Sequence, residues 1–368
     1  MKIRRLPADQ RDQLKNDSEN GRHIPTILLE KVSHLTHISY KDDLRRYASK
    51  YGSASFSELE DEYDDVYGFC YTLIKRTQGE PLAGALETTK NLELVMQSQD
   101  LEDHYRDHFI HSVQDFFLGS VILDYFYPQF RGWYSRELCS SPEKSVEMAW
   151  LLASVFHDQR RSVENKKWLG EEPGMHMPVS FDDDEEFLTN LSSLYDCLQR
   201  GKKLHRWRYG AHTDYHRGLR TVLGEFYKKQ NHGVLSAMSL INRVKRNFDG
   251  KVPAHCAVAA LAISTHNGKP RKALTAEGIF PLKIDRFPIS CLLMICDAMQ
   301  EWGRPHAYSD DDTRLSAIQL SSNRVHCEVA FVSTKSAVAK MKECDSVRRC
   351  IKSPKIGFSV SARVGLAM

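Results

Sequence analysis

The sequence lacks paired cysteines, long apolar runs and internal repeats, and each absence argues against a class of protein. None of its nine cysteines belongs to a Cys-x-x-Cys pair, and several, such as Cys70 and Cys296, lie inside apolar runs. Cysteines of this kind are typical of reduced thiols that pack as small hydrophobic residues. No run approaches the roughly 18 apolar residues of a membrane span, and the first residues lack the apolar stretch of a signal peptide. We therefore expect a cytoplasmic protein without a membrane partner.

The composition and the net charge are those of an ordinary folded domain. The formal net charge is +3, which does not by itself indicate binding to nucleic acid. Hydrophobic residues make up 41% and charged residues 27% of the 368 positions, enough for a sizeable core. A chain of this length fits one large domain with additions, or two domains.

Apolar residues recur at helical spacing over much of the chain. The clearest case is His104–Tyr127, where they follow at steps of three and four until Pro128, which is expected to end the helix. The first 55 residues have weak periodicity, and residues 159–200 are predicted to be irregular, with the acidic run Asp182–Glu186 as a solvated loop or a helix start. Further helices are predicted over Leu59–Arg76, Pro142–Asp158, His232–Asn247, Ala254–His266 and Ile289–Trp302.

The last part of the chain changes character. Val325–Val332 and Ile356–Val364 favour strands, and Ser336–Cys344 favours a short helix. The predicted fold class is mainly α, with a small C-terminal α/β appendage. We expect the division to be an N-terminal helical extension (1–100), a helical domain (101–310) and the appendage (315–368).

Side chains that can bind metal interrupt two of the apolar helices. The pair His157-Asp158 closes the apolar segment Met148–Phe156, and Asp297 lies within Leu292–Ala298. A lone carboxylate in so apolar a stretch costs free energy unless it is paired or bound to a metal. Imidazole and carboxylate ligands together suit Mn, Fe, Co, Ni or Zn, whereas Mg prefers oxygen ligands alone.

Three more histidines on other predicted helices can join this set, namely His111, His232 and His266. His108 and His111 are three positions apart and share a helix face, so either can be a ligand while the other supports it or contacts substrate. A helical bundle can bring such side chains together in its core. The simpler alternatives are buried histidines satisfied by hydrogen bonds, and an ion pair between Asp297 and a buried arginine.

The ordered set resembles the HD superfamily of metal-dependent phosphohydrolases. The resemblance covers about residues 104–305 and depends on three phrases, His111-Ser-Val, Val155-Phe-His-Asp and Leu292-Leu-Met-Ile-Cys-Asp. It implies an HD-type helical bundle around one or two divalent transition metals, with Mg as a further candidate. By this resemblance the first ion would be held by His111, His157, Asp158 and Asp297. Asp158 would bridge to a second ion held by His232 and His266.

The resemblance also implies an activity, the hydrolysis of a phosphoester or phosphoanhydride. The substrate class would be a nucleotide or another phosphorylated small molecule. Asp158, which would bridge the ions, and His108, which can assist as an acid or bind phosphate, are candidate catalytic residues. Arg161 stands where some members carry Lys, and its guanidinium can bind a phosphate through two hydrogen bonds, which makes it a candidate for both catalysis and substrate binding. The pair Gln159-Arg160 departs from the apolar residue and Gly that many members have there.

A basic and aromatic segment, Lys202–Tyr209, precedes the helix that begins at His232. Arg206 and Arg208 are its candidate substrate-binding residues, and the segment can stack a base or follow a single strand of nucleic acid. The alternative is a solvated basic face with one aromatic ring anchored in the core.

The leading hypothesis is therefore a metal-dependent phosphohydrolase. An HD-type di-iron oxygenase would use the same His/Asp set, so metal content would separate the two. The third hypothesis is a catalytically inactive nucleotide-binding sensor module, which the Gln159-Arg160 departure favours. A nuclease belongs to the first class and depends on the basic segment alone.

Overall fold

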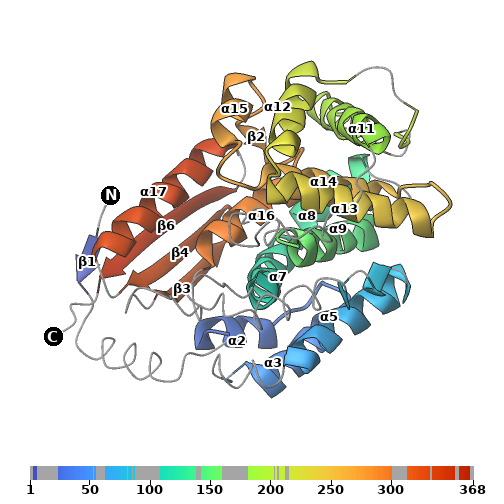
Figure 1. Ribbon diagram of the computed structural model, residues 1–368. Helices are drawn as coiled ribbons and strands as arrows, with labels where there is room; N and C mark the ends of the chain where they lie inside the picture. The colour runs from blue at the N-terminus through green and yellow to red at the C-terminus, as the bar shows by residue number, and fades with distance from the viewer. Residues whose placement is uncertain are drawn as a thin grey trace, which may run out of the picture.

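The protein is mainly helical, as predicted, with a four-stranded sheet and a two-stranded sheet among its described residues (Figure 1). None of the helices in the described part of the chain has both the length and the apolar character of a membrane span. The computed structural model describes residues 3–5, 24–52, 54, 63–80, 82–84, 86–87, 108–137, 142–159, 181–202, 204, 207–211, 215–300, 313–331, 334–352 and 356–364.

Four helices form the centre of the molecule, and each packs against at least two of the others. They are α7 (His108–Tyr125), α9 (Pro142–Phe156), α14 (Ala254–Thr265) and α16 (Pro288–Met299). Nearly every residue of α14 and α16 is buried, as expected for helices that are apolar on all sides. α13 (His232–Asn247) lies along α14, with its apolar stripe turned inward.

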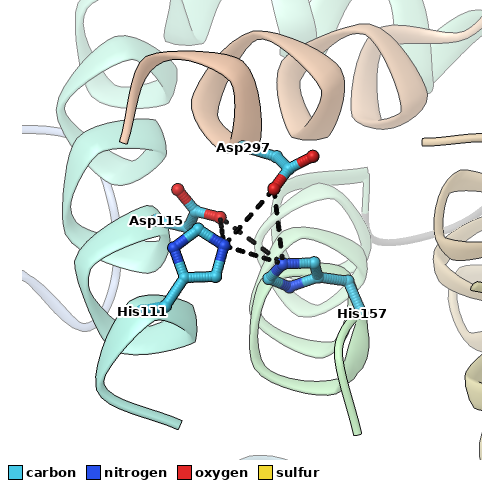
Figure 2. Close-up of side chains that lie close together, drawn as sticks. All are labelled: His111, Asp115, His157 and Asp297. Atoms are coloured by element: carbon cyan, nitrogen blue, oxygen red, sulfur yellow. Dashed lines mark hydrogen bonds and ion pairs between the residues drawn. The ribbon is translucent and has the colours of Figure 1, made fainter. Parts of the chain in front are cut away.

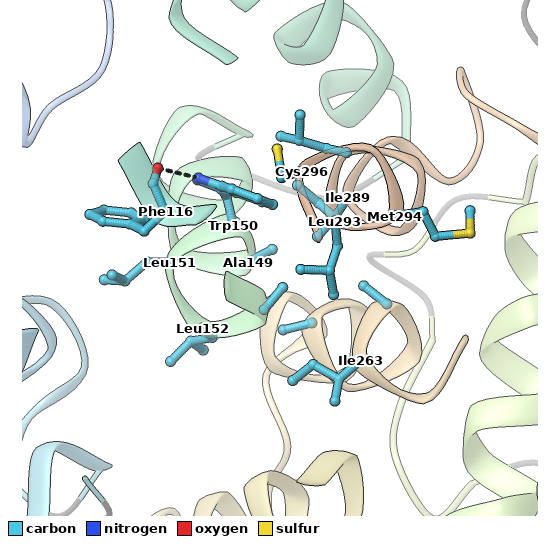
Figure 3. Close-up of a cluster of buried hydrophobic side chains, with 14 of the residues drawn as sticks. Phe116, Ala149, Trp150, Leu151, Leu152, Ile263, Ile289, Leu293, Met294 and Cys296 are labelled. Carbon is cyan, nitrogen blue, oxygen red and sulfur yellow. Dashed lines mark hydrogen bonds between the residues drawn. The ribbon is translucent and has the colours of Figure 1, made fainter. Parts of the chain in front are cut away.

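The indole of Trp150 joins α9 to α7. The ring is fully buried, and its Nε1 donates a hydrogen bond to the carbonyl oxygen of Phe116 at 3.3 Å. Figure 3 shows the ring beside Phe116, with Ile289 and Leu293 of α16 on the other side. Gly119 of α7 lies against the ring, where a Cβ atom would stand only 1.9 Å from Cζ2 of Trp150. The absence of a side chain at Gly119 therefore sets how closely α7 and α9 approach.

The N-terminal helices cover α7 from one side (Figure 1). They are α2 (Thr26–Ser33), α3 (Lys41–Tyr51) and α5 (Tyr63–Gln78). Asp124 of α7 holds the turn between α2 and α3: its carboxylate accepts hydrogen bonds from the backbone N–H groups of Thr36, His37 and Ile38 at 2.9, 2.6 and 2.9 Å. A buried carboxylate with three such donors fixes this turn against α7.

Several predicted helix limits differ from those observed. The prediction over 232–247 is confirmed residue for residue, and the other predicted helices end within a few residues of α5, α7, α9, α14 and α16. The helix predicted to end at Pro128 does end there, because α7 stops at Tyr125, and a separate helix, α8 (Tyr127–Glu137), follows with Pro128 in its first turn, where proline is tolerated. The irregular prediction for 159–200 is wrong for its described end, where α11 (Phe181–Gln199) starts in the acidic run. Two further helices are α12 (Arg217–Lys228) and α15 (Arg271–Ala276).

Three strands of the C-terminal region and one N-terminal strand form a four-stranded sheet in the order β1-β6-β4-β3. Its strands are β1 (Ile3–Arg5), β3 (Thr313–Ser321), β4 (Arg324–Phe331) and β6 (Gly357–Val364). β4 and β6 confirm the two predicted strands, while β1 and β3 were not predicted. α17 (Thr334–Cys350) is longer than the predicted short helix and packs between the sheet and α16. The two-residue strands β2 (Leu282–Lys283) and β5 (Ile351–Lys352) pair in parallel and tie this region to the helices.

Candidate metal centre

Four buried or half-buried side chains from three central helices meet at one end of the bundle. His111 and Asp115 come from the first two turns of α7, His157 follows the last residue of α9, and Asp297 comes from α16 (Figure 2). One donor atom of each lies within 4.8 Å of the others. Segments 186 residues apart in sequence therefore meet at a single point.

The distances between these donor atoms suit a shared cation. His111 Nε2 lies 3.4 Å from His157 Nε2, 3.4 Å from Asp115 Oδ2 and 3.3 Å from Asp297 Oδ1. Ligand atoms placed about 2.1 Å from one transition-metal ion stand roughly 3.0 to 3.4 Å apart. Two imidazole nitrogens and two carboxylates are side-chain donors that divalent metal ions accept in proteins. The residues present can therefore hold a divalent metal ion.

Hydrogen bonds on the far side of each ring fix which nitrogen faces the centre. His157 Nδ1 donates to the carbonyl oxygen of Ser154 at 2.7 Å. His111 Nδ1 lies against the side-chain oxygen of Gln300, which holds it in the same way. A proton on Nδ1 leaves the Nε2 lone pair of each neutral ring directed at the centre, as metal binding requires.

Unpaired carbonyl oxygens at helix ends explain the Nδ1 hydrogen bond of His157 and a similar one of His266. The last turn of an α-helix leaves carbonyl oxygens without a partner within the helix. His157, three residues beyond Ser154, uses one at the end of α9, and His266 uses the carbonyl of Ile263 at 2.6 Å at the end of α14. Both histidines thus end a helix and turn Nε2 inward.

A second group adjoins the first and contains His157, Asp158 and His266. Asp158 Oδ1 is 3.9 Å from both His157 Nε2 and His266 Nε2. His232 reaches this group through Asp158, with its Nε2 at 3.2 Å from Oδ1. The structure thus brings all six predicted ligands to one end of the bundle, but it divides them into two neighbouring groups.

His232 differs from the other three histidines in what faces its ring. Asn267 Nδ2 lies 3.2 and 3.4 Å from its two ring nitrogens. The Asn267 oxygen accepts the Lys269 N–H, so a donor rather than an acceptor faces His232. Gly233 permits the close approach of α13 to α14 here, because a Cβ atom would lie 2.9 Å from the Ile263 carbonyl oxygen.

Burial shapes the electrostatics of the centre. Asp115 and His157 are fully buried, and Asp297 is the most open ligand candidate, with a side chain 24% exposed. Burial alone would raise the pKa of Asp297, but in the absence of metal a proton on His111 Nε2, shared with Asp297, and the nearby imidazoles outweigh burial and hold that pKa well below its usual range. That proton has to leave before Nε2 can bind a metal ion. Burial lowers the pKa of His266 to about 3, so this ring is neutral near pH 7.

Sequence reasoning missed Asp115. It lies one turn after His111 in a largely buried helix, so the argument about a buried carboxylate applies to it as well. The spacing of four residues also places it on the same helix face as His111. The buried carboxylate and its spacing from His111 are the two sequence signals that identify this position.

Of the remaining predicted site residues, Arg208 is the one whose side chain belongs to the described part of the chain. Arg161 and Arg206 lie outside the described residues, and His108 begins α7 but its side chain is likewise outside them. Arg208 is exposed and donates a hydrogen bond to the Trp207 carbonyl oxygen at 2.9 Å. Trp207 is buried, as the alternative of a basic face with one anchored ring expects. Among the described residues, the Asp297 carboxylate lies 3.3 Å from His111 Nε2, and not beside an arginine as the ion-pair alternative expected.

The geometry of the chain itself is the basis for this candidate centre. Comparison with protein-family models, curated proteins and solved structures found no match.

Proposed function

We propose that the protein is a metal-dependent phosphohydrolase of the HD type that cleaves a phosphoester or phosphoanhydride. One observation carries the proposal: His111, His157, Asp297 and the adjoining Asp158 group meet at one end of a helical bundle. These residues follow one another along the chain in the order on which the resemblance to the HD superfamily depends. A nucleotide or similar phosphorylated small molecule is the proposed substrate class.

The protein's own residues would hold the ions and prepare the substrate. Bound divalent ions would lower the pKa of a coordinated water and stabilise charge on a phosphoryl group. Gln300 and Ser154 orient the rings of His111 and His157, so the ligands are held in position before any ion binds. In this proposal Arg161 binds a substrate phosphate and His108 supplies a proton to the leaving group.

Charge decides how such a centre would bind phosphate. Three carboxylates, Asp115, Asp158 and Asp297, belong to the two groups. With all three ionised, one divalent ion leaves a formal charge of −1 and two ions leave +1. Only the two-ion state attracts a phosphate ester, so we propose the dinuclear form as the active one.

Metal analysis followed by a hydrolysis panel tests this function. The purified protein is stripped with a chelator, reloaded with Mn²⁺, Co²⁺, Ni²⁺ or Mg²⁺, and assayed with nucleoside mono-, di- and triphosphates. We expect His157→Ala and Asp297→Ala to lose both metal and hydrolysis. His255→Ala, a change at the opposite end of α14 from His266, is expected to keep both.

Each of the other hypotheses has its own result in this experiment. Absence of hydrolysis in the metal-loaded protein would contradict the proposal. Nucleotide binding without turnover would support the sensor module. Bound iron together with substrate-dependent oxygen consumption would support the oxygenase.

A further inference from the structure

Asp115 lies on the side of the histidine rings where a metal ion would bind. Its Oδ2 is 3.4 Å from His111 Nε2 and 3.6 Å from His157 Nε2. Asp297 Oδ1 approaches the same two nitrogen atoms, at 3.3 and 4.0 Å. The two carboxylates therefore stand in equivalent positions toward both rings, as Figure 2 shows.

A carboxylate that only orients a ligand histidine occupies a different place. Such a group accepts the N–H of the ring nitrogen that points away from the metal. For His111 that position is taken by Gln300, and for His157 it is taken by the Ser154 carbonyl. Asp115 meets neither Nδ1 atom and contacts Nε2 of both rings. Its location is that of a ligand.

His157 has a single Nε2 lone pair, so it can bind one ion. Its Nε2 is closer to His111 Nε2 and Asp115 Oδ2, at 3.4 and 3.6 Å, than to Asp158 Oδ1 at 3.9 Å, while Asp297 Oδ1 lies at 4.0 Å. This favours its membership of the group that contains Asp115. Asp158 is then left with His266 and the nearby His232.

We propose that Asp115 is a protein ligand of the first metal ion, completing a centre of two histidines and two aspartates with His111, His157 and Asp297. Asp158 belongs instead to the neighbouring centre and is not needed to hold the first ion. This inference rests on the proposed function only in using the same site, since it concerns which residues bind the metal. It departs from the ligand set that the family resemblance implies, where Asp158 holds the first ion.

The affinity of the Asp115→Asn variant for metal tests the proposal without any substrate. Asparagine keeps the shape of the side chain but removes its charge, so the buried packing is retained. We expect the affinity for the first Co²⁺ or Mn²⁺ ion to fall at least about 100-fold, more than for loss of an orienting group. The visible absorption of bound Co²⁺ should change as well, because that spectrum reports the ligand set. Asp124→Asn, a buried aspartate on the same helix that contacts residues 36–38, should keep wild-type affinity.

Thermal unfolding separates a ligand role from a structural one. Without metal, Asp115→Asn should melt at or above the wild-type temperature, because it removes a buried negative charge beside Asp297. With Mn²⁺ or Co²⁺, the wild type should gain more stability than the variant, since stabilisation by a ligand follows its affinity. A variant that is equally destabilised with and without metal would assign Asp115 a structural role and overturn the proposal.

The Asp158→Asn variant provides a second test of the ligand assignment. We expect it to retain the first ion with its Co²⁺ spectrum, whereas Asp115→Asn does not. If Asp158→Asn loses the first ion and Asp115→Asn keeps it, the proposal is wrong even when the wild type hydrolyses nucleotides. If the two variants behave as expected but no substrate is hydrolysed, the ligand assignment stands and the proposed function fails.

Discussion

The side-chain oxygen of Gln300 accepts a hydrogen bond from Nδ1 of His111, 189 positions earlier in the chain. The nitrogen of the same amide donates to Gln114, which leaves the oxygen to face His111. Both residues are buried, so the contact links the end of α16 to the first turn of α7. It fixes the protonation and direction of the His111 ring before a metal arrives.

The Gln300 contact can be removed without removing a ligand. Gln300→Met keeps the shape of the side chain but lacks the acceptor, so we expect metal affinity to fall about 10- to 100-fold. Gln300→Glu retains an acceptor and should preserve most of the affinity. Competition with a metal-binding dye measures both. Equal affinities in wild type and Gln300→Met would show that the contact does not support the centre.

Gly119 is expected to tolerate no side chain. The methyl group of Gly119→Ala would collide with Trp150 and separate α7 from α9, at a cost of about 3 kcal/mol in unfolding free energy. Because these helices carry His111 and His157, metal affinity should fall too. Gly68→Ala on α5 is the control: its Cβ meets nothing within 4 Å, and the change should stabilise by up to about 1 kcal/mol. Denaturant unfolding compares the two, and a neutral Gly119→Ala would contradict the packing argument.

Asp124 should matter for stability and not for metal binding. Asp124→Ala leaves the N–H groups of residues 36–38 without their acceptor, which we expect to cost about 3 kcal/mol. Asp124→Asn keeps one acceptor oxygen and should cost about half as much. Limited proteolysis should cut first near this turn in the alanine variant. Wild-type resistance there would mean that α2 and α3 are held by other contacts.

The central helices could be predicted because their sequence signals are local. α13 begins at a residue preceded by Asn231, whose side chain accepts a hydrogen bond from the Val234 N–H, and its apolar residues follow at helical spacing. α14 and α16 are long enough and apolar enough that proline and glycine at their ends mark them clearly. The mainly α class follows from these elements.

Other features could not be predicted, or were misinterpreted. The acidic residues at the start of α11 favoured a loop, although apolar residues follow them at helical steps of three and four. These apolar residues are buried in the structure: Leu188, Leu191, Tyr195 and Leu198. β1 has only three residues and becomes a strand through its pairing with β6. The division of the histidines and aspartates into two groups depends on how α7, α9 and α16 are rotated against one another. No spacing within a single helix encodes that rotation.

His255 predicts a pH dependence of stability that is separate from the metal centre. Burial lowers its pKa from 6.5 to about 4 in the folded protein. The unfolded chain therefore takes up a proton first as pH falls, and stability present above pH 6.5 is progressively lost towards pH 4. Allowing for partial exposure, the loss is on the order of 2 kcal/mol. Urea unfolding of wild type and His255→Gln at pH 7.5 and 5 tests this, and a difference that does not change with pH would contradict it.

Phosphate binding should require the second metal ion. With Asp115, Asp158 and Asp297 ionised, the centre is formally −1 with one divalent ion and becomes positive only with two. At close range in a buried site this change of sign outweighs screening by salt. When Mn²⁺ is titrated into metal-free protein with inorganic phosphate present, bound phosphate should lag behind the first equivalent of metal and rise with the second. Calorimetry and equilibrium dialysis measure metal and phosphate separately. Phosphate binding that saturates with the first equivalent would show that a single ion suffices, and would contradict the charge assignment of the three carboxylates.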